Sequence, residues 1–132
     1  MPPTPWKTSF QPDPDREYLA LLTVLPVKHY RTIPRFLGYT RRIEAQLAET
    51  VGLVGYSLRA ELLRRRFWTL SVWEDDNALM NFVRTTPHAQ VMETLQGHMG
   101  VTRFVRWTLK GASVPPDWQG ALLRYRKETN TE

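Results

Sequence analysis

Two residues of this sequence combine a reactive or aromatic side chain with a position suited to a shared cavity. Trp73 lies in the segment 67–74, whose aromatic and β-branched residues are typical of a strand. His88 follows Pro87, which fits the first position of a helix. A histidine with a pKa of about 6.5 can act as a general base or a ligand, and a tryptophan can line an apolar pocket. We therefore take Trp73 and His88 as candidate catalytic residues.

Each of these two residues also has a purely structural interpretation. Trp73 could serve only as a core residue, because a tryptophan contributes a large buried area. His88 could be a surface or helix-capping residue. The other histidines, His29 and His98, add no spacing typical of a metal site. Without a third polar partner, Trp73 and His88 mark a pocket and not a mechanism, and no metal site is predicted.

Further residues are expected to line the same pocket. Ser71 shares a strand face with Trp73, because side chains alternate along a strand. The predicted pocket-lining residues are Tyr56, Ser71, Phe82, Met92 and Arg103. Arg103 is included because Arg103 and Arg106 point to opposite faces of one strand, so that one of them approaches an apolar face. A buried arginine needs an acidic partner or an anion, and Glu61 is the expected partner.

Composition narrows the classes of partner. The chain has 132 residues, a net charge of +5 and no cysteine, so disulfides and cysteine-ligated metals are excluded. Arginine supplies most of the positive charge, with its densest cluster at 64–66. We interpret this cluster as a solvated turn and expect no nucleic-acid partner, because no recognition motif accompanies it. No apolar run approaches the roughly 18 residues of a membrane span, and the proline-rich start is unlike a signal peptide. We expect a cytoplasmic protein without a membrane partner.

The elements that must position these residues can be predicted from periodicity and turn signals. Strands are expected at 18–27, 53–63, 67–74 and 101–109, and helices at 33–47, 75–85, from Thr86 onward, and over a short stretch after 115–117. On the second strand, Val54, Tyr56 and Leu58 are expected to share a face. The second and third strands are adjacent in the sequence, which favours a β-hairpin.

The order strand, helix, strand, strand, helix, strand predicts an α+β, ferredoxin-like split βαβ fold with an antiparallel four-stranded sheet. We expect residues 1–16 to form a proline-rich arm, 17–111 the ferredoxin-like domain, and 112–132 a C-terminal extension with a short helix. Both faces of the sheet are apolar, and helices on one face leave the other uncovered. A second copy of the sheet would cover it, so we predict a homodimer.

The segment from Trp68 to Asp75, followed by Ala78-Leu79, Phe82 and Pro87-His88, resembles the antibiotic-biosynthesis-monooxygenase-like group of dimeric α+β barrel proteins. More narrowly, it is similar to an uncharacterised bacterial family related to spheroidene monooxygenase. The resemblance covers roughly residues 19–110. It implies that Trp73 lines a pocket between sheet and helices, and it makes His88 a candidate haem ligand. Haem-degrading relatives use an asparagine on the first strand, where this chain has Thr23.

Two classes of function, and a third interpretation, follow from these observations. The first is a monooxygenase-like enzyme that acts on an apolar, aromatic or polyene substrate and needs no cofactor, or uses haem. The second is a non-catalytic protein that binds haem or another small hydrophobic ligand in the same pocket. The third is a structural dimer whose pocket is filled by its own side chains.

Overall fold

The computed structural model describes residues 3–85, 95, 97–100 and 102–130. The strands are β1 (Lys7–Thr8), β2 (Glu17–Pro26), β3 (Leu53–Glu61), β4 (Arg66–Trp73) and β5 (Arg103–Lys110). The α-helices are α1 (Ile33–Ala48), α2 (Asp76–Arg84) and α4 (Trp118–Asn130), and short 3-10 turns lie at Tyr30–Thr32, Leu62–Arg64 and Gly111–Ser113. No helix among these residues is long and apolar enough to cross a membrane.

The sheet has the topology that the sequence predicts, with one strand more. Its order is β1-β3-β4-β2-β5, and every pairing is antiparallel. The expected hairpin joins β3 to β4, with Glu61 opposite Arg66 next to the turn. The α+β, split βαβ arrangement is therefore confirmed, while the four-stranded sheet was an underestimate. The extra strand is the two-residue β1, which pairs with the edge of β3.

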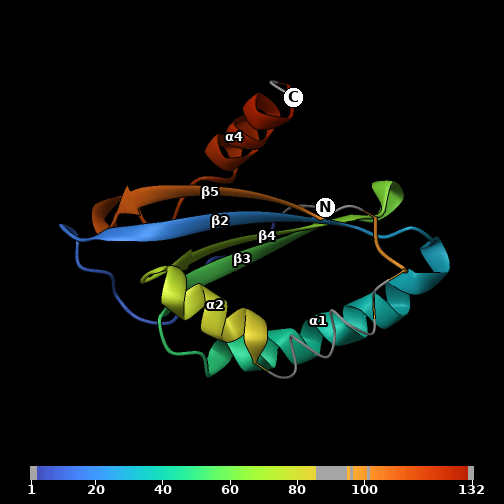
Figure 1. The fold of residues 1–132 in the computed structure, drawn as a ribbon, viewed down its shortest axis with the longest axis horizontal. Coiled ribbons are helices and arrows are strands. Elements are labelled where there is room, and N and C mark those ends of the chain that lie inside the picture. Colours follow the sequence, from blue (N-terminus) through green and yellow to red (C-terminus); the bar gives the residue numbers. More distant parts are fainter. Residues whose placement is uncertain (1–2, 86–94, 96, 101, 131–132) are drawn as a thin grey trace.

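Helices α1 and α2 cover one face of the sheet (Figure 1). Helix α1 begins where the sequence places it, with a proline in its first turn. Helix α2 begins with Asp75 as its N-cap, whose carboxylate accepts a hydrogen bond of 2.8 Å from the Ala78 backbone N–H. The helix expected from Thr86 lies outside the described residues, apart from the buried Leu95.

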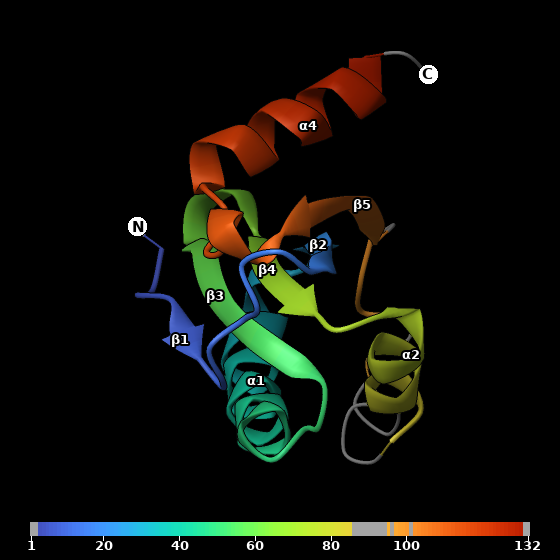
Figure 2. The same cartoon turned by 90° about the vertical axis from the view of Figure 1, so that its left-hand side faces the viewer.

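The opposite face of the sheet is covered by the two ends of the same chain. Figure 2 shows α4 on this face, with the sheet between α4 and the pair of helices α1 and α2. Trp118 and Tyr125 of α4 pack on a buried cluster that includes Trp68, and the Tyr125 and Trp68 ring centroids are 5.1 Å apart. Trp6 of the arm packs on the same face. The sequence predicts a second copy as the cover; the chain itself supplies part of it, and the homodimer stays a prediction.

Two local expectations are corrected. Val54 does not share a face with Tyr56: it packs with Val72 on the α4 face, because the pairing register shifts between Leu53 and Gly55. The C-terminal helix is not short, since α4 runs for 13 residues to Asn130.

Candidate functional site

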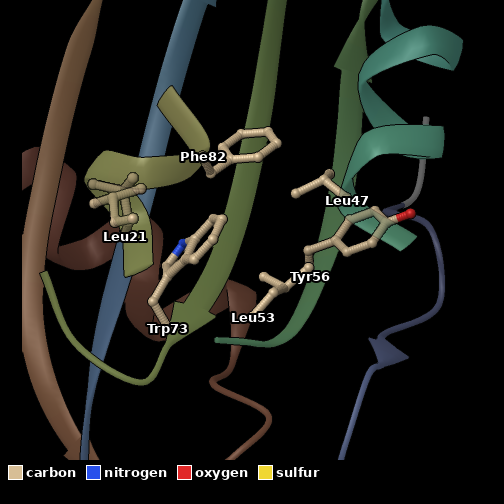
Figure 3. Packing of buried hydrophobic residues seen from close by; sticks show 7 residues of the cluster. Leu21, Leu47, Leu53, Tyr56, Trp73 and Phe82 are labelled. Carbon is tan, nitrogen blue, oxygen red and sulfur yellow. The ribbon is translucent and has the colours of Figure 1, made fainter. Parts of the chain in front are cut away.

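Trp73 lies at the centre of a buried aromatic cluster between the sheet and the helices. It is 2% exposed and packs with Leu21, Leu53 and Phe82, among other residues. The Trp73 and Phe82 ring centroids are 5.3 Å apart at an interplanar angle of 39°. Figure 3 shows both rings side by side, with Leu47 and Tyr56 further along the same layer. The indole N–H of Trp73 donates a hydrogen bond of 2.9 Å to the Ser71 hydroxyl, which satisfies the buried polar atoms of both residues.

Tyr56 forms the polar border of this cluster. Its ring is buried, and its hydroxyl lies 3.4 Å from a carboxylate oxygen of Glu44, to which it donates a hydrogen bond. Lys7 of the arm forms an ion pair with Glu44 at 3.2 Å and stands 5.5 Å from the Tyr56 ring centroid. Burial raises the pKa of the Tyr56 phenol, and the hydrogen bond to Glu44 raises the pKa of Lys7. At neutral pH Tyr56 is therefore a hydrogen-bond donor and not a base.

A groove opens beside the aromatic cluster, between the end of α1 and helix α2. Its volume is about 510 Å³, within the usual range for small-molecule sites. The lining residues are Gln46, Glu49, Thr50, Val51, Gly52, Glu74, Asp75, Asn77, Ala78, Asn81, Phe82 and Thr85. Phe82 belongs both to this groove and to the Trp73 cluster. Ala78 is shared as well, but Phe82 is the aromatic residue of the two, so a ligand in the groove would reach the buried aromatic rings there.

The polar residues of the groove have structural roles as well. The Gln46 side-chain amide donates to the Phe82 and Thr85 carbonyl oxygens at 3.3 and 3.4 Å, which ties α1 to the end of α2. Glu74 pairs with Arg16 at 3.8 Å, and Asp75 caps α2. Sequence reasoning missed this groove, because its residues come from two helix ends and a loop and have no motif spacing. Of the predicted pocket-lining residues, Phe82 lies in this groove, and the helix-start signal at 75–76 also pointed to this region.

The structure brings together four of the residues singled out from the sequence. Trp73, Ser71, Tyr56 and Phe82 lie on the helix side of the sheet, within or against one cluster. Arg103 does not join them. It stands opposite Val24 on β2, and Val24 packs on the α4 face with Trp68.

Two predicted site residues and one predicted ion pair remain. His88 and Met92 lie outside the described residues. Glu61, the expected partner of Arg103, forms an ion pair of 3.3 Å with Arg66 and accepts a hydrogen bond from the Trp68 indole. In the part of the chain that the structure describes, no three His, Asp or Glu side chains are grouped to hold a metal.

Comparisons with known proteins place the fold but not the activity. No protein-family model matches the sequence, and neither does any curated protein. Among solved structures, an antibiotic biosynthesis monooxygenase superposes with a TM-score of 0.61 at 16% identity, over 67% of this chain and 95% of that one. SnoaB, a cofactor-independent oxygenase from Streptomyces nogalater, gives 0.60 at 16%, over 76% and 99%.

A conserved protein from Methanosarcina mazei Go1 is similar to the same extent, with a TM-score of 0.61 at 15% identity, over 68% of this chain and 90% of that one. At such identities a likeness shows the fold alone. The chain thus has the fold of antibiotic-biosynthesis-monooxygenase-like proteins, as the resemblance in its sequence implies. The narrower link to spheroidene monooxygenase stays a prediction.

Proposed function

We propose that this protein is a small monooxygenase-like enzyme that binds an apolar, aromatic or polyene substrate between the sheet and helices α1 and α2. The observation that carries the proposal is the position of Phe82, which lines the groove and packs on Trp73. A substrate that entered beside Phe82 would meet flat aromatic surfaces in a water-poor environment. The fold shared with a cofactor-independent oxygenase supports the same reaction class.

In this proposal the described residues bind and orient the substrate, and none of them serves as the general base. Trp73 and Phe82 provide aromatic walls. The Ser71 hydroxyl accepts the Trp73 indole hydrogen bond and so fixes the ring. The Tyr56 hydroxyl donates to Glu44, so this residue closes the polar border of the aromatic cluster. His88 is the proposed base, because an ordinary histidine pKa of about 6.5 suits proton removal near neutral pH.

The stoichiometry is simplest for an aromatic substrate with an activated methylene group. The base removes one proton from the methylene carbon, a carbon–oxygen bond forms with O₂, and loss of water leaves a carbonyl group. One methylene compound and one O₂ give one ketone and one water. The substrate carbon supplies all four electrons that O₂ takes up, so this reaction needs no external reductant.

Oxygen uptake with a panel of polyenes and of aromatic compounds that carry an activated methylene group tests the proposal. Trp73→Phe should lower kcat/KM by about tenfold through loss of substrate positioning, and His88→Ala by about 10²–10⁴-fold through loss of the base. Trp107→Phe is the matched control, because Trp107 packs on the opposite face of the sheet. Turnover that is unchanged in both Trp73→Phe and His88→Ala would refute the assignment of the site.

A second candidate is binding without chemistry, of haem or another hydrophobic ligand. It is favoured by the nature of the described cluster, in which the one titratable residue, Tyr56, is held in its protonated form. Haem titration separates the two candidates: a Soret band that His88→Ala abolishes would support ligation by that residue. If the protein shows no turnover and binds no haem, the interpretation that remains is a structural protein whose pocket is filled by its own side chains. The 2% exposure of Trp73 agrees with that interpretation.

A further inference from the structure

The 3-10 turn between β3 and β4 presents two leucines to solvent. Leu63 is 88% exposed and Leu62 is 40% exposed. Tyr30, on the neighbouring turn before α1, is 56% exposed and donates a hydrogen bond of 2.6 Å to the Leu63 carbonyl oxygen. We call these three residues the apolar tip. Both turns lie at the same end of the sheet, on the right in Figure 1.

The apolar tip is held in place by its own contacts. Arg65, which follows the turn, has a left-handed backbone with φ of 54°. Its guanidinium group donates to the Lys28 carbonyl oxygen at 3.1 Å and stands 4.9 Å from the centroid of the Tyr30 ring. Its carbonyl oxygen accepts a hydrogen bond of 2.8 Å from the Val27 N–H. These contacts hold the two turns against each other, so the exposed leucines lie on an ordered surface.

Among the described residues, the exposed charges beside the apolar tip are positive. The segments 26–32, 62–66 and 97–100 meet at this end, and none of them contains an Asp or a Glu. Their basic side chains beside the tip include Lys28, Arg31, Arg64 and Arg65, and the first three are exposed. The one acid at the base of the turn, Glu61, is paired with Arg66.

The opposite end of the sheet is acidic. Val51 is also 88% exposed there, so exposure of one apolar residue does not distinguish the tip. Its neighbours in the groove include Glu49, Glu74 and Asp75. The distinguishing feature of the tip is that protruding leucines and basic side chains occur together.

We propose that the apolar tip docks the protein onto the surface of an anionic phospholipid membrane. Protruding leucines insert into the boundary between headgroups and acyl chains, while surrounding lysine and arginine residues attract anionic headgroups. The protein lies on the membrane and does not span it. This departs from the sequence expectation of no membrane partner, which rested on the lack of a spanning segment. The inference does not depend on the proposed oxygenase activity.

Vesicle sedimentation tests the proposal, with neutral phosphatidylcholine vesicles compared with vesicles that also contain phosphatidylserine. The wild-type chain should bind the anionic vesicles more strongly, and added salt should weaken that binding. Leu63→Ser should lower the partition coefficient by roughly tenfold, the factor expected for withdrawing one leucine from an apolar phase. The Arg31→Gln/Arg64→Gln double variant should lower it by roughly thirtyfold. Val51→Ser, equally exposed at the acidic end, should bind like wild type.

A second measurement does not require a destabilising substitution. Because the chain has no cysteine, Leu63→Cys and Val51→Cys can each carry a single polarity-sensitive dye. The dye at 63 should shift to the blue with anionic vesicles, and the dye at 51 should not.

Three results would overturn the proposal. The first is wild-type protein that stays in solution with anionic vesicles. The second is an unshifted dye at position 63. The third is binding that Leu63→Ser leaves intact while the double variant abolishes it. That last result would show that charge alone acts, as it would for a nucleic acid or an acidic protein.

Discussion

Replacing Gly55 by alanine tests whether the N-terminal arm packs on its own sheet. A Cβ atom built at this position would lie 2.5 Å from Trp6 Nε1 and 2.8 Å from the Lys7 carbonyl oxygen. Contacts under 3.0 Å are not tolerated, and the Lys7 oxygen belongs to the backbone of β1. The methyl group can therefore be accommodated only if the arm moves away from β3.

The cost follows from what the arm contacts. Overpacking of this kind costs typically about 1–3 kcal/mol. Movement of the arm also weakens its hydrogen bonds with β3, two of which join the Thr4 N–H to the Leu58 carbonyl and the Ser9 N–H to the Val54 carbonyl. Each contributes about 0.5–1.5 kcal/mol net. Together these terms lower the free energy of unfolding of Gly55→Ala by about 2–6 kcal/mol.

Urea denaturation measures this change, and Gly38→Ala is the matched control. A Cβ at Gly38 meets nothing within 4 Å, and the residue lies inside α1. There the same substitution should stabilise the fold by about 0.5–1 kcal/mol. Limited trypsin digestion gives a second readout, because a detached arm exposes the bond after Lys7. A Gly55→Ala variant that is as stable as wild type, with unchanged cleavage after Lys7, would refute the reasoning.

Further outcomes are expected for the cap, the phenol and the assembly. Asp75→Ala should cost about 0.5–2 kcal/mol in urea denaturation, because the Ala78 N–H loses its acceptor; an unchanged midpoint would contradict the capping role. Burial raises the pKa of Tyr56 in the folded protein. The contribution of the protonated phenol to the free energy of unfolding is therefore complete below the unfolded-state pKa of about 10, and it is lost as the pH rises through the higher pKa of the folded state. Ultraviolet titration should show one late-ionising phenol that Tyr56→Phe removes, and a titration unaltered by that substitution would exclude the burial effect. Light scattering at micromolar concentration should give the mass of a homodimer, and a stable monomer would count against it.

Much of the fold is predictable because its signals are local. Strand β2 is apolar on both faces, α1 has one inward stripe, and both are found where periodicity places them. The hairpin between β3 and β4 follows from their closeness in the sequence. Side chains alternate along a strand, and this is why Trp73 and Ser71 of β4 could be grouped before the structure was known.

The remaining features depend on contacts between distant segments. Strand β1 has two residues and exists only because β3 offers an open edge. The shift at Gly55 moves Val54 to the other face, and no motif announces it. Arg103 was grouped with Trp73 because the sequence does not say which face of the sheet the helices cover.

The most direct test of the proposed activity is turnover under ¹⁸O₂ with the best aromatic methylene compound of the substrate panel. The account predicts consumption of one O₂ per product, with one labelled oxygen in the product and the other in water. It also predicts that Trp73→Phe slows this incorporation while Trp107→Phe does not. A product without label, or no oxygen uptake with any compound that binds at Trp73, would contradict the account.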